Sequence, residues 1–385
     1  MIKVLHVTGA MNRGGAEVML MDIFRNIGPQ FHFDFLINYN KKKGIVAGDF
    51  DTEILSTRST LFYIPTQWEI GPLNYCKEFK KLVQESKPDI VHIHMNSKSG
   101  VIALAAKMAG VKHVITHAHA DIKFRGSFIY KMVSNLEMKF QKFLINKYSD
   151  QYWGCSLEAN KSLFYFSKLN NENSAIINNA VAVQQYQEVS LEESTSLRKT
   201  YKIGENTLIL GNVGRIVQHK NVLFIVEVLN ELKIRGIDFV FVFAGRADQA
   251  AYLEEINAKI DAYHLKNNVI YLGLRDDIPV VMNSLDVFVG PALKEGFGLV
   301  AVEAQAAGIP CVLYTGFPQS VDMQLNLVTF LDSFIVAPWA DAILEVKNQR
   351  CTDKALIRNR IIELGFDSVS NSKIIGERYK NIENV

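Results

Sequence analysis

Two glutamates and two glycines stand close together in the segment KEGFGLVAVEAQAAGIP, residues 294–310. The segment follows an apolar run and has a helical pattern beginning near Gly298. Unpaired backbone amides at a helix start suit a phosphate, and glycine lets the backbone come close to a ligand. Glu303, one turn into the helix, could accept ribose hydroxyls, and Glu295 in the preceding loop could reach a sugar hydroxyl. The alternative is a capped amphipathic helix with solvent-facing glutamates, which the apolar neighbours 300–302 disfavour.

Two cations follow an apolar run at 207–213. Arg215 and Lys220 lie in GNVGRIVQHKN, residues 211–221. If the run is a strand, both cations stand at its carboxyl end and could neutralise a diphosphate. Fixed cations there would stabilise the charge that a leaving nucleoside diphosphate gains in the transition state. The alternative is a surface arginine and a lysine at a helix start.

The first half has glycines after its first apolar run and histidines at the end of a later one. Gly14 and Gly15 lie in the loop after an apolar run at 2–8, and the loop is not G-x-G-x-x-G, so a dinucleotide is not indicated. In THAHAD, His119 is favoured over His117 because it falls beyond the apolar run. A neutral imidazole can exchange a hydrogen bond with a sugar hydroxyl, but a structural role stays open for both.

Three further patterns are weaker. His92 and His94 share one face of a predicted strand and are interpreted as structural rather than as a metal pair. Asp49-Phe50-Asp51 spells D-x-D, but no apolar strand precedes it, so it is interpreted as chance and no metal site is expected. The four cysteines are widely separated and are expected to be reduced thiols: Cys76, Cys155, Cys311 and Cys351.

Residues 121–148 interleave basic and aromatic side chains on a predicted helix. Such a pattern is typical of helices that lie in a membrane interface, and it would also attract anionic lipid or a lipid-linked pyrophosphate. A solvated helix with an ordinary core face remains an equal alternative. The residues are Lys123, Arg125, Lys131, Lys139, Lys142, Lys147, Phe124, Phe128, Tyr130, Phe140 and Phe143.

The elements that must position these residues alternate along the chain. Short Val/Ile/Leu/Phe runs predict parallel strands buried on both faces, and helical patterns between them predict doubly wound α/β sheets. The series runs through the chain twice, divided by the polar stretch 184–206. The predicted strands are 2–8, 33–38, 89–94, 112–117, 175–178, 207–213, 238–244, 269–272, 286–290 and 310–314. The predicted helices include 17–27, 74–85, 221–235 and 299–307.

Length and charge agree with two such domains. The chain has 385 residues and a formal charge of +2, which argues against a dedicated nucleic-acid binder. Residues 1–185 hold 22 Lys and Arg against 15 Asp and Glu, whereas 186–385 hold 20 against 25. We therefore expect only the first half to meet something anionic. No signal peptide or transmembrane run is indicated, and a cytoplasmic location is expected.

These motifs together resemble the retaining family-4 glycosyltransferases of bacterial capsule and exopolysaccharide synthesis. Glu295 and Glu303 match the family's E-x7-E motif, and VLHVTGAMNRGGAEVML at 4–20 and GNVGRIVQHKN also fit. The resemblance implies a GT-B fold, in which two Rossmann-like domains face each other across a cleft. It implies an acceptor-binding domain at 1–183, a nucleotide-sugar-binding domain at 184–367, and a helix at 368–385 that crosses back to the first domain.

The resemblance also implies the chemistry. It points to sugar transfer with retention, from a nucleotide-sugar, UDP by default, to a lipid-linked or oligosaccharide acceptor at the inner membrane face. No metal or other cofactor is implied. The implied catalytic residues are Glu295, His119, Arg215 and Lys220. The implied donor-binding residues are Gly214, Arg215, Lys220, Glu295, Gly296, Phe297, Gly298, Leu299 and Glu303, and the acceptor side would use Gly14, Gly15 and His117.

Two departures from the family pattern leave alternatives open. The family's G-x-G-P is replaced by Gly245-Arg246-Ala247-Asp248, and YTGFPQSVDM at 314–323 replaces G-x-x-E. The first puts the local phosphate contacts in question, and the second leaves the sugar undetermined. A nucleotide-sugar epimerase on the same fold and a non-catalytic sugar-nucleotide-binding subunit are the alternatives; the set Arg215, Lys220 and Glu295 disfavours the second.

Overall fold

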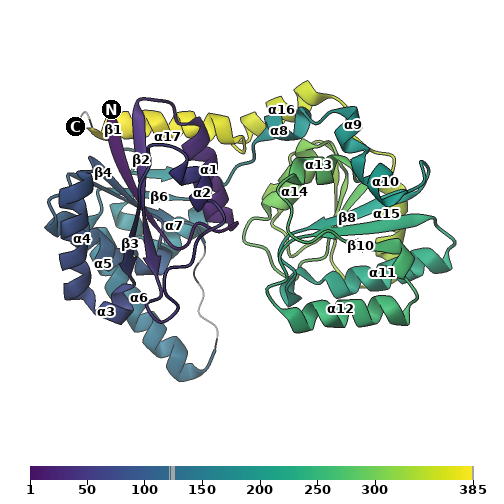
Figure 1. The fold of residues 1–385 in the computed structure, drawn as a ribbon, viewed down its shortest axis with the longest axis horizontal. Coiled ribbons are helices and arrows are strands. Elements are labelled where there is room, and N and C mark those ends of the chain that lie inside the picture. The colour runs from purple at the N-terminus through teal and green to yellow at the C-terminus, as the bar shows by residue number, and fades with distance from the viewer. Residues whose placement is uncertain (121, 123–125, 384–385) are drawn as a thin grey trace. The chain divides into compact units, whose positions relative to one another are not determined.

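The chain divides into two compact units. The computed structural model describes residues 1–120, 122 and 126–383 (Figure 1). Unit 1 comprises Met1–Ala180 together with Ser368–Val385, and unit 2 comprises Val181–Asp367. The expected division lay at 183/184, three residues later than the one found here. The C-terminal stretch is helical and belongs with the N-terminal unit.

Unit 1 is built on a parallel sheet. Its described strands run in the order β3-β2-β1-β4-β5-β6-β7, and every neighbouring pair is parallel. The strands are β1 (Ile2–Thr8), β2 (Phe31–Tyr39), β3 (Leu61–Pro65), β4 (Ile90–Ile93), β5 (His113–Ala118), β6 (Gln151–Gly154) and β7 (Ser174–Ile176). The sequence patterns missed β3 and β6, which are short and mix aromatic with polar or proline residues.

Helices cover both faces of this sheet, which explains its near-continuous apolar strands. One face packs on α1 and α17 and the other on α4 and α5. The helices of unit 1 are α1 (Gly15–Asn26), α2 (Asp51–Leu55), α3 (Gln67–Ile70), α4 (Pro72–Ser86), α5 (Ser99–Met108), α6 (Phe128–Tyr148), α7 (Leu157–Leu163) and α17 (Ser368–Glu383), with short 3₁₀ turns at η1 (Asn96–Lys98) and η2 (Phe166–Lys168).

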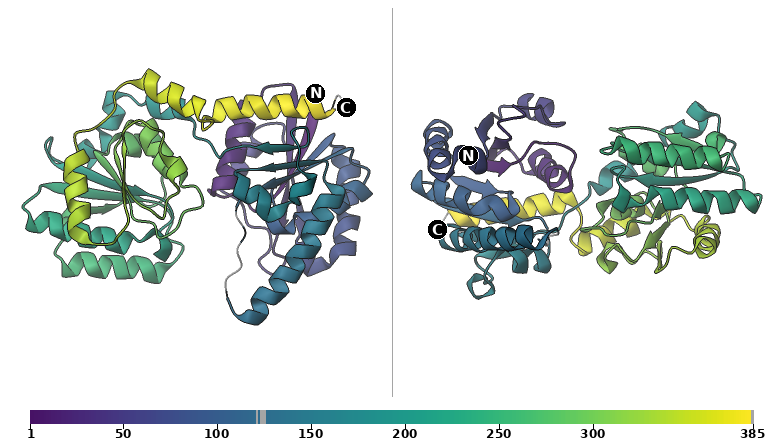
Figure 2. Two further views of the ribbon diagram at one scale, coloured as in Figure 1. Left: turned by 180° about the vertical axis from the view of Figure 1, so that it is seen from behind. Right: turned by 90° about the horizontal axis from the view of Figure 1, so that it is seen from below.

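The last helix of the chain, α17, is part of the core of unit 1. It lies alongside α1, as the yellow and purple helices of Figure 2 show. Ile375 and Tyr379 are fully buried, and a Cβ at Gly376 would lie 3.3 Å from the ring of Phe31. Removing α17 would therefore expose the face of the unit 1 sheet that packs on α1 and α17.

Unit 2 repeats the architecture. Its described strands run in the order β10-β9-β8-β11-β12-β13, all parallel. They are β8 (Leu208–Val213), β9 (Phe239–Ala244), β10 (Val269–Tyr271), β11 (Val287–Gly290), β12 (Cys311–Tyr314) and β13 (Val328–Leu331). The sequence patterns missed β13, whose four residues are only half-buried.

Helices again lie on both faces. They are α8 (Val183–Gln187), α9 (Leu191–Ser194), α10 (Ser196–Tyr201), α11 (Val222–Ile234), α12 (Ala250–Ala262), α13 (Ile278–Asn283), α14 (Leu299–Ala306), α15 (Val336–Val346) and α16 (Lys354–Glu363), with 3₁₀ turns η3 (Gln218–Lys220), η4 (Lys266–Asn268) and η5 (Gln319–Val321). The polar stretch 184–206 is mostly helical: it holds α9, α10 and all but the first residue of α8.

Both sheets reverse their strand order next to the first strand of the unit. The reversal falls between β1 and β4 in unit 1 and between β8 and β11 in unit 2. In open α/β sheets, ligands bind at the carboxyl ends of the strands at such a switch point. The residues after these four strands are therefore the first place to look for a site.

Two other expectations concern the whole chain. The four cysteines form no disulfide. Across the described ranges, no helix combines the length and the apolar character needed to cross a bilayer.

Candidate active site

A lysine and a glutamate meet at the switch point of unit 2. Lys220 ends η3 in the loop after β8, and Glu295 lies in the loop after β11. The Nζ of Lys220 donates to Oε1 of Glu295. Only 17% of the lysine side chain and 10% of the glutamate side chain are exposed. Neither charge could lose its partner without remaining largely out of water, so the pair holds both side chains in place.

The helix start predicted from the sequence adjoins this pair. Gly298 caps α14 with φ +89°, and a Cβ there would lie 2.5 Å from the Phe317 ring and 3.6 Å from Cγ of Glu295. Glycine is thus required by both conformation and space. The first amides of a helix have no intrahelical partner. The start of α14 therefore places unpaired amide donors next to the Lys220–Glu295 pair. Glu303 is the fifth residue of α14 and is half-buried.

The remaining residues of the predicted helix start differ in their surroundings. Gly296 is exposed, and an added Cβ there would meet nothing within 4 Å. Phe297 stacks on Phe366 with ring centroids 4.9 Å apart, and Leu299 packs on the core of unit 2. Of these three, Gly296 alone leaves room beside the backbone, whereas Phe297 and Leu299 anchor the loop.

Arg215 is placed differently from Lys220. Its guanidinium lies 3.4 Å from Oδ2 of Asp248, and 55% of the side chain is exposed. Arg246 also contacts Asp248, at 2.8 Å. An anionic ligand at Arg215 would therefore compete with Asp248. The sequence patterns paired Arg215 with Lys220 in a single role and missed the aspartate.

The glycines beside Arg215 bring the loops after β8 and β9 close together. A Cβ at Gly245 would lie 1.9 Å from the carbonyl oxygen of Gly214, and Gly245 has φ +144°. The loops after β8 and β9 can approach this closely only because Gly245 has no side chain. A Cβ at Gly214 would in turn lie 3.8 Å from Nζ of Lys220, so Gly214 borders the lysine.

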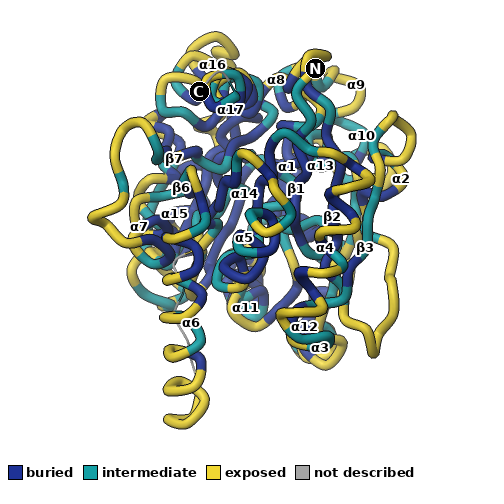
Figure 3. The backbone as a smooth tube through the Cα atoms, turned by 90° about the vertical axis from the view of Figure 1, so that its left-hand side faces the viewer, coloured by how far each residue is buried: buried dark blue, intermediate teal, exposed yellow. Residues whose placement is uncertain are grey.

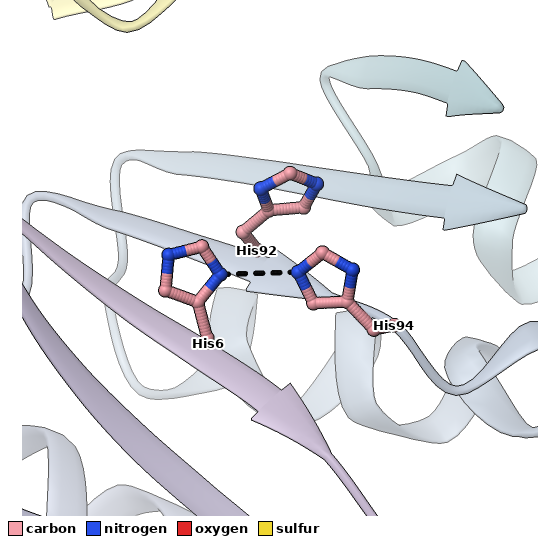
Figure 4. A group of neighbouring side chains, drawn as sticks. All are labelled: His6, His92 and His94. Carbon is pink, nitrogen blue, oxygen red and sulfur yellow. Dashed lines mark hydrogen bonds between the residues drawn. The ribbon is translucent and has the colours of Figure 1, made fainter. Parts of the chain in front are cut away.

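Unit 1 carries five buried or half-buried histidines at its switch point. His6 lies on β1, His92 on β4 and His117 on β5, while His94 and His119 directly follow β4 and β5. Figure 4 shows three of them with their rings turned toward one another. Nδ1 of His6 lies 3.0 Å from Nε2 of His94, and Nδ1 of His94 lies 2.8 Å from Nε2 of His119.

A second set of bonds joins the other histidines. Nε2 of His92 lies 3.3 Å from Nδ1 of His117, and Nδ1 of His92 lies 2.7 Å from the hydroxyl of Tyr379 on α17. His117 stacks on His119 with centroids 4.3 Å apart. His119 is thus at the strand end, as predicted, and His117 lies one layer beneath it, inside β5.

Burial keeps these rings neutral. It lowers the pKa of His6 to about 3 and that of His119 to about 4. It also lowers the pKa of His92, His94 and His117, and their histidine neighbours lower it further. Protonating one ring would place a charge in a medium that solvates it poorly.

By distance alone, the histidines could hold a metal ion. Within the described part of the chain, His6, His92 and His94 form one group and His94, His117 and His119 another, with ligand atoms within 4.8 Å of one another. The sequence patterns recognised only His92 and His94, because His6 comes from a different strand. A histidine in the middle of the apolar run VLHVT was the signal that could have pointed to it.

Two other sequence motifs have structural partners. Gly14 caps α1 with φ −106°, so this position does not need positive φ, and a Cβ there would lie 2.3 Å from a carboxylate oxygen of Glu17. In the D-x-D, Asp49 accepts from the backbone N–H of Arg13 at 3.0 Å, and Asp51 accepts from that of Gly48 at 2.8 Å. Gly15 has open space beside it.

Helix α6 exposes the apolar side chains that a core helix would bury. Figure 3 shows much of it in yellow, the colour of exposed residues. Lys131, Lys139 and Lys147 of the same helix are exposed as well. Lys123, Phe124 and Arg125 lie outside the described residues. The exposed apolar side chains are Phe128, Ile129, Tyr130, Met132, Val133, Leu136, Phe140 and Phe143.

Family models match both units. The model "Glycosyl transferases group 1" matches residues 193–361, and "Glycosyl transferase 4-like" matches 49–147. The putative glycosyltransferase EpsF of Bacillus subtilis is 32% identical over 374 residues, which span 96% of this chain and 94% of that protein. The chain belongs to the group 1 glycosyltransferases. This confirms the family that the E-x7-E segment predicted.

Further similarities support the fold and activity of this glycosyltransferase. An Escherichia coli protein, UDP-Gal:alpha-D-GlcNAc-diphosphoundecaprenol alpha-1,3-galactosyltransferase, is 26% identical over 355 residues, 85% of each chain. The crystal structure of Anabaena HepE in complex with UDP and glucose superimposes with a TM-score of 0.75 at 19% identity, covering 99% of this chain and 100% of that one. The predicted GT-B fold of two parallel-sheet α/β domains is confirmed.

Proposed function

We propose that this glycosyltransferase moves a sugar from a UDP-sugar to a lipid-linked acceptor in cell-surface polysaccharide synthesis, retaining the anomeric configuration and needing no metal. The observation that carries the proposal is the Lys220–Glu295 pair beside the tip of α14. The name of the E. coli relative supports a UDP-sugar donor and a diphosphoundecaprenol-linked acceptor. UDP in the HepE crystal supports the nucleotide.

The residues of unit 2 would share the work on the donor. A diphosphate at the tip of α14 would face the first amides of the helix and the ammonium of Lys220, both of which favour negative charge. Glu295, held by Lys220, would accept from a sugar hydroxyl, and Glu303 from the ribose. Arg215 would reach the diphosphate after giving up Asp248. Catalysis would then rest on position and charge.

The residues of unit 1 would meet the acceptor. Gly14 caps α1 and Gly15 begins it, directly after the loop that follows β1, and His119 lies just beyond β5. All three therefore stand at the carboxyl edge of one sheet. A neutral imidazole there can bond to a hydroxyl without adding charge. The five histidines at these strand ends add no charge of their own, which suits a sugar hydroxyl as the group they meet.

Helix α6 would hold the enzyme at an anionic lipid surface. Its exposed aromatic and aliphatic side chains could enter the interface, and its exposed lysines would face anionic head groups. Lys142 is engaged differently: its Nζ donates to the carbonyl oxygens of Lys161 and Ser162. A lipid-linked acceptor would give the enzyme a reason to bind the surface that carries it.

Ligand-induced stabilisation tests the donor assignment. The melting temperature of the protein is measured with UDP, ADP and GDP in the presence of a chelator, because a ligand that binds the folded state alone raises apparent stability. We expect the largest increase with UDP, and a smaller one in Lys220→Met. Transfer from radiolabelled UDP-sugars to an undecaprenol-diphosphate sugar then tests the acceptor, and NMR of the product tests retention. A larger increase with ADP or GDP than with UDP would contradict the proposal.

A further inference from the structure

The histidines of unit 1 form two hydrogen-bonded relays. The β1 relay consists of His6, His94 and His119, joined Nδ1 to Nε2 at 3.0 and 2.8 Å. The α17 relay consists of Tyr379, His92 and His117. In both, every bond joins an Nδ1 to an Nε2 or to the phenol, so the protons within a relay are not independent.

Proton counting restricts the β1 relay to two states. A neutral imidazole carries one proton, and each bond needs one. If Nδ1 of His6 carries a proton, Nε2 of His94 accepts, so the proton of His94 sits on Nδ1, and His119 is protonated on Nδ1 in turn. If His6 is protonated on Nε2, all three rings are. A mixture of tautomers would leave one bond with two protons or none, at the cost of an unpaired buried group.

The phenol selects one state for the α17 relay. Tyr379 is fully buried and its burial raises the pKa of the hydroxyl, which keeps its proton. Donation from the hydroxyl to Nδ1 of His92 satisfies that proton, whereas the reverse bond would leave the hydroxyl proton without an acceptor among the hydrogen bonds of the described residues. Nδ1 of His92 then accepts, its Nε2–H donates to Nδ1 of His117, and His117 carries its proton on Nε2.

Both relays end at the carboxyl edge of β5. In the described structure, Nδ1 of His119 and Nε2 of His117 are buried without a hydrogen-bond partner, as is Nε2 of His6 at the inner end of the β1 relay. The amide N–H of His119 is held by the side-chain oxygen of Asn96 at 2.7 Å. The ring of His117, at the end of the α17 relay, stacks on the ring of His119, at the end of the β1 relay.

We propose that the α17 relay fixes the proton of His117 on Nε2 and that the β1 relay makes His119 share one tautomer with His6 and His94. In this way Tyr379 and the three inner histidines act as positioning residues for an acceptor oxygen at the end of β5. The relay itself follows from the hydrogen bonds, and only the identity of the ligand rests on the proposed function. A ring with a fixed tautomer presents either a donor or an acceptor, never a mixture, and so orients a hydroxyl in one way.

Imidazole NMR tests the relays without any need for turnover. Protein labelled with ¹⁵N-histidine is treated with a chelator, and long-range ¹H–¹⁵N spectra show which ring nitrogen is protonated. We expect Nε2–H for His92 and His117, and one shared tautomer for His6, His94 and His119. Different tautomers within one relay would overturn the proposal. So would rings that change only when the chelator removes a metal, because the metal would then have held them.

Tyr379→Phe removes the phenol hydroxyl that anchors the α17 relay and leaves the ring. We expect Nδ1–H to become populated in His92 and His117, while the β1 relay keeps its tautomer. Tyr75→Phe is the matched control, because Tyr75 is also fully buried in unit 1 and its hydroxyl bonds to Asn38 at 2.9 Å. It should lose similar stability and leave all five rings unchanged. Unchanged spectra in Tyr379→Phe would refute the relay.

Turnover then connects the relay to the site. We expect kcat/KM for the acceptor to fall about 2- to 10-fold in Tyr379→Phe, the range of one ordinary hydrogen bond, and to stay near the wild-type value in Tyr75→Phe. Equal losses in the two variants would show that the relay only stabilises the fold. If no acceptor supports turnover, the proposed function fails while the NMR result still stands.

Discussion

Replacing Lys220 by methionine separates two roles that this lysine could have. Methionine keeps the apolar stem and removes the charge. If Lys220 stabilises a leaving diphosphate, the variant loses an interaction between opposite charges. At about 4 Å and an effective dielectric constant of about 20, such an interaction is worth about 4 kcal/mol. Each 1.36 kcal/mol changes a rate about tenfold, so we expect kcat/KM to fall by about two to three orders of magnitude.

The Lys220–Glu295 contact complicates this reading, because Lys220→Met also leaves Glu295 unpaired with only 10% of its side chain exposed. A displaced carboxylate could by itself reduce activity. The double variant Lys220→Met/Glu295→Gln removes that unpaired charge while keeping the shape of the side chain. Because Glu295 is itself placed on the donor sugar, the reference for the double variant is Glu295→Gln alone. If the lysine serves the diphosphate, the double variant falls below Glu295→Gln by about the factor that separates Lys220→Met from wild type. If the lysine only neutralises Glu295, the double variant is as active as Glu295→Gln.

The assay measures release of nucleoside diphosphate at varied donor concentration, well below the melting temperature of each variant. Loss of one partner of a buried pair is also destabilising, so melting temperatures are recorded first. Lys233→Met is the control, since Lys233 in α11 donates to the carbonyl oxygens of Tyr263 and His264, away from the pair. A Lys220→Met enzyme within threefold of wild-type kcat/KM would refute the diphosphate role.

Three further results are expected. Buried neutral histidines lower stability in acid: below about pH 6.5 the unfolded chain binds protons that the folded chain refuses, so unit 1 should lose about 1.4 kcal/mol per pH unit for each ring. For His119 this loss continues to about pH 4 and for His6 to about pH 3; chemical denaturation across this range checks it, and a flat profile would contradict the lowered pKa values. Gly245→Ala should destabilise unit 2 by about 1–3 kcal/mol, because the alanine Cβ would overlap the carbonyl oxygen of Gly214. The shift of the denaturant midpoint measures this loss. Leu136→Glu in α6 should reduce the fraction of protein that sediments with anionic vesicles and leave the melting temperature unchanged. Ile234 in α11 is equally exposed, at 71%, so Ile234→Glu should bind the vesicles as wild type does. Equal binding by both variants would argue against α6 as the contact.

The sequence placed Lys220 and Glu295 at one edge of a sheet for a topological reason. Lys220 and Glu295 are 75 residues apart, yet each was placed in a loop after an apolar strand. The carboxyl ends of parallel strands meet at one edge of a sheet, so such loops come together whatever their separation. Gly298 was recognisable because a glycine before an apolar helix has a distinct use.

The partners of these residues were not predictable in the same way. That Lys220 contacts Glu295 while Arg215 contacts Asp248 depends on side-chain directions and on the close approach of Gly245 to Gly214. Neither has a periodic signal in the sequence. The strands β3, β6 and β13 were missed because four or five residues give too little alternation to distinguish a strand from a loop. The histidine relays needed the register between β1 and β4, where His6 pairs with His92.

The two sheets reverse their strand order at the same place, next to the first strand of each unit, but the side chains at the two switch points differ in charge. Unit 2 places a cation and a helix tip there, both suited to an anionic leaving group, beside a carboxylate that can accept a hydrogen bond from a hydroxyl. Unit 1 places five imidazoles there, and burial keeps them neutral. Part of the excess of basic residues in the first half lies on α6, where exposed lysines stand among exposed aromatic rings. Those lysines are available to an anionic surface, whereas the imidazoles at the strand ends add no charge there.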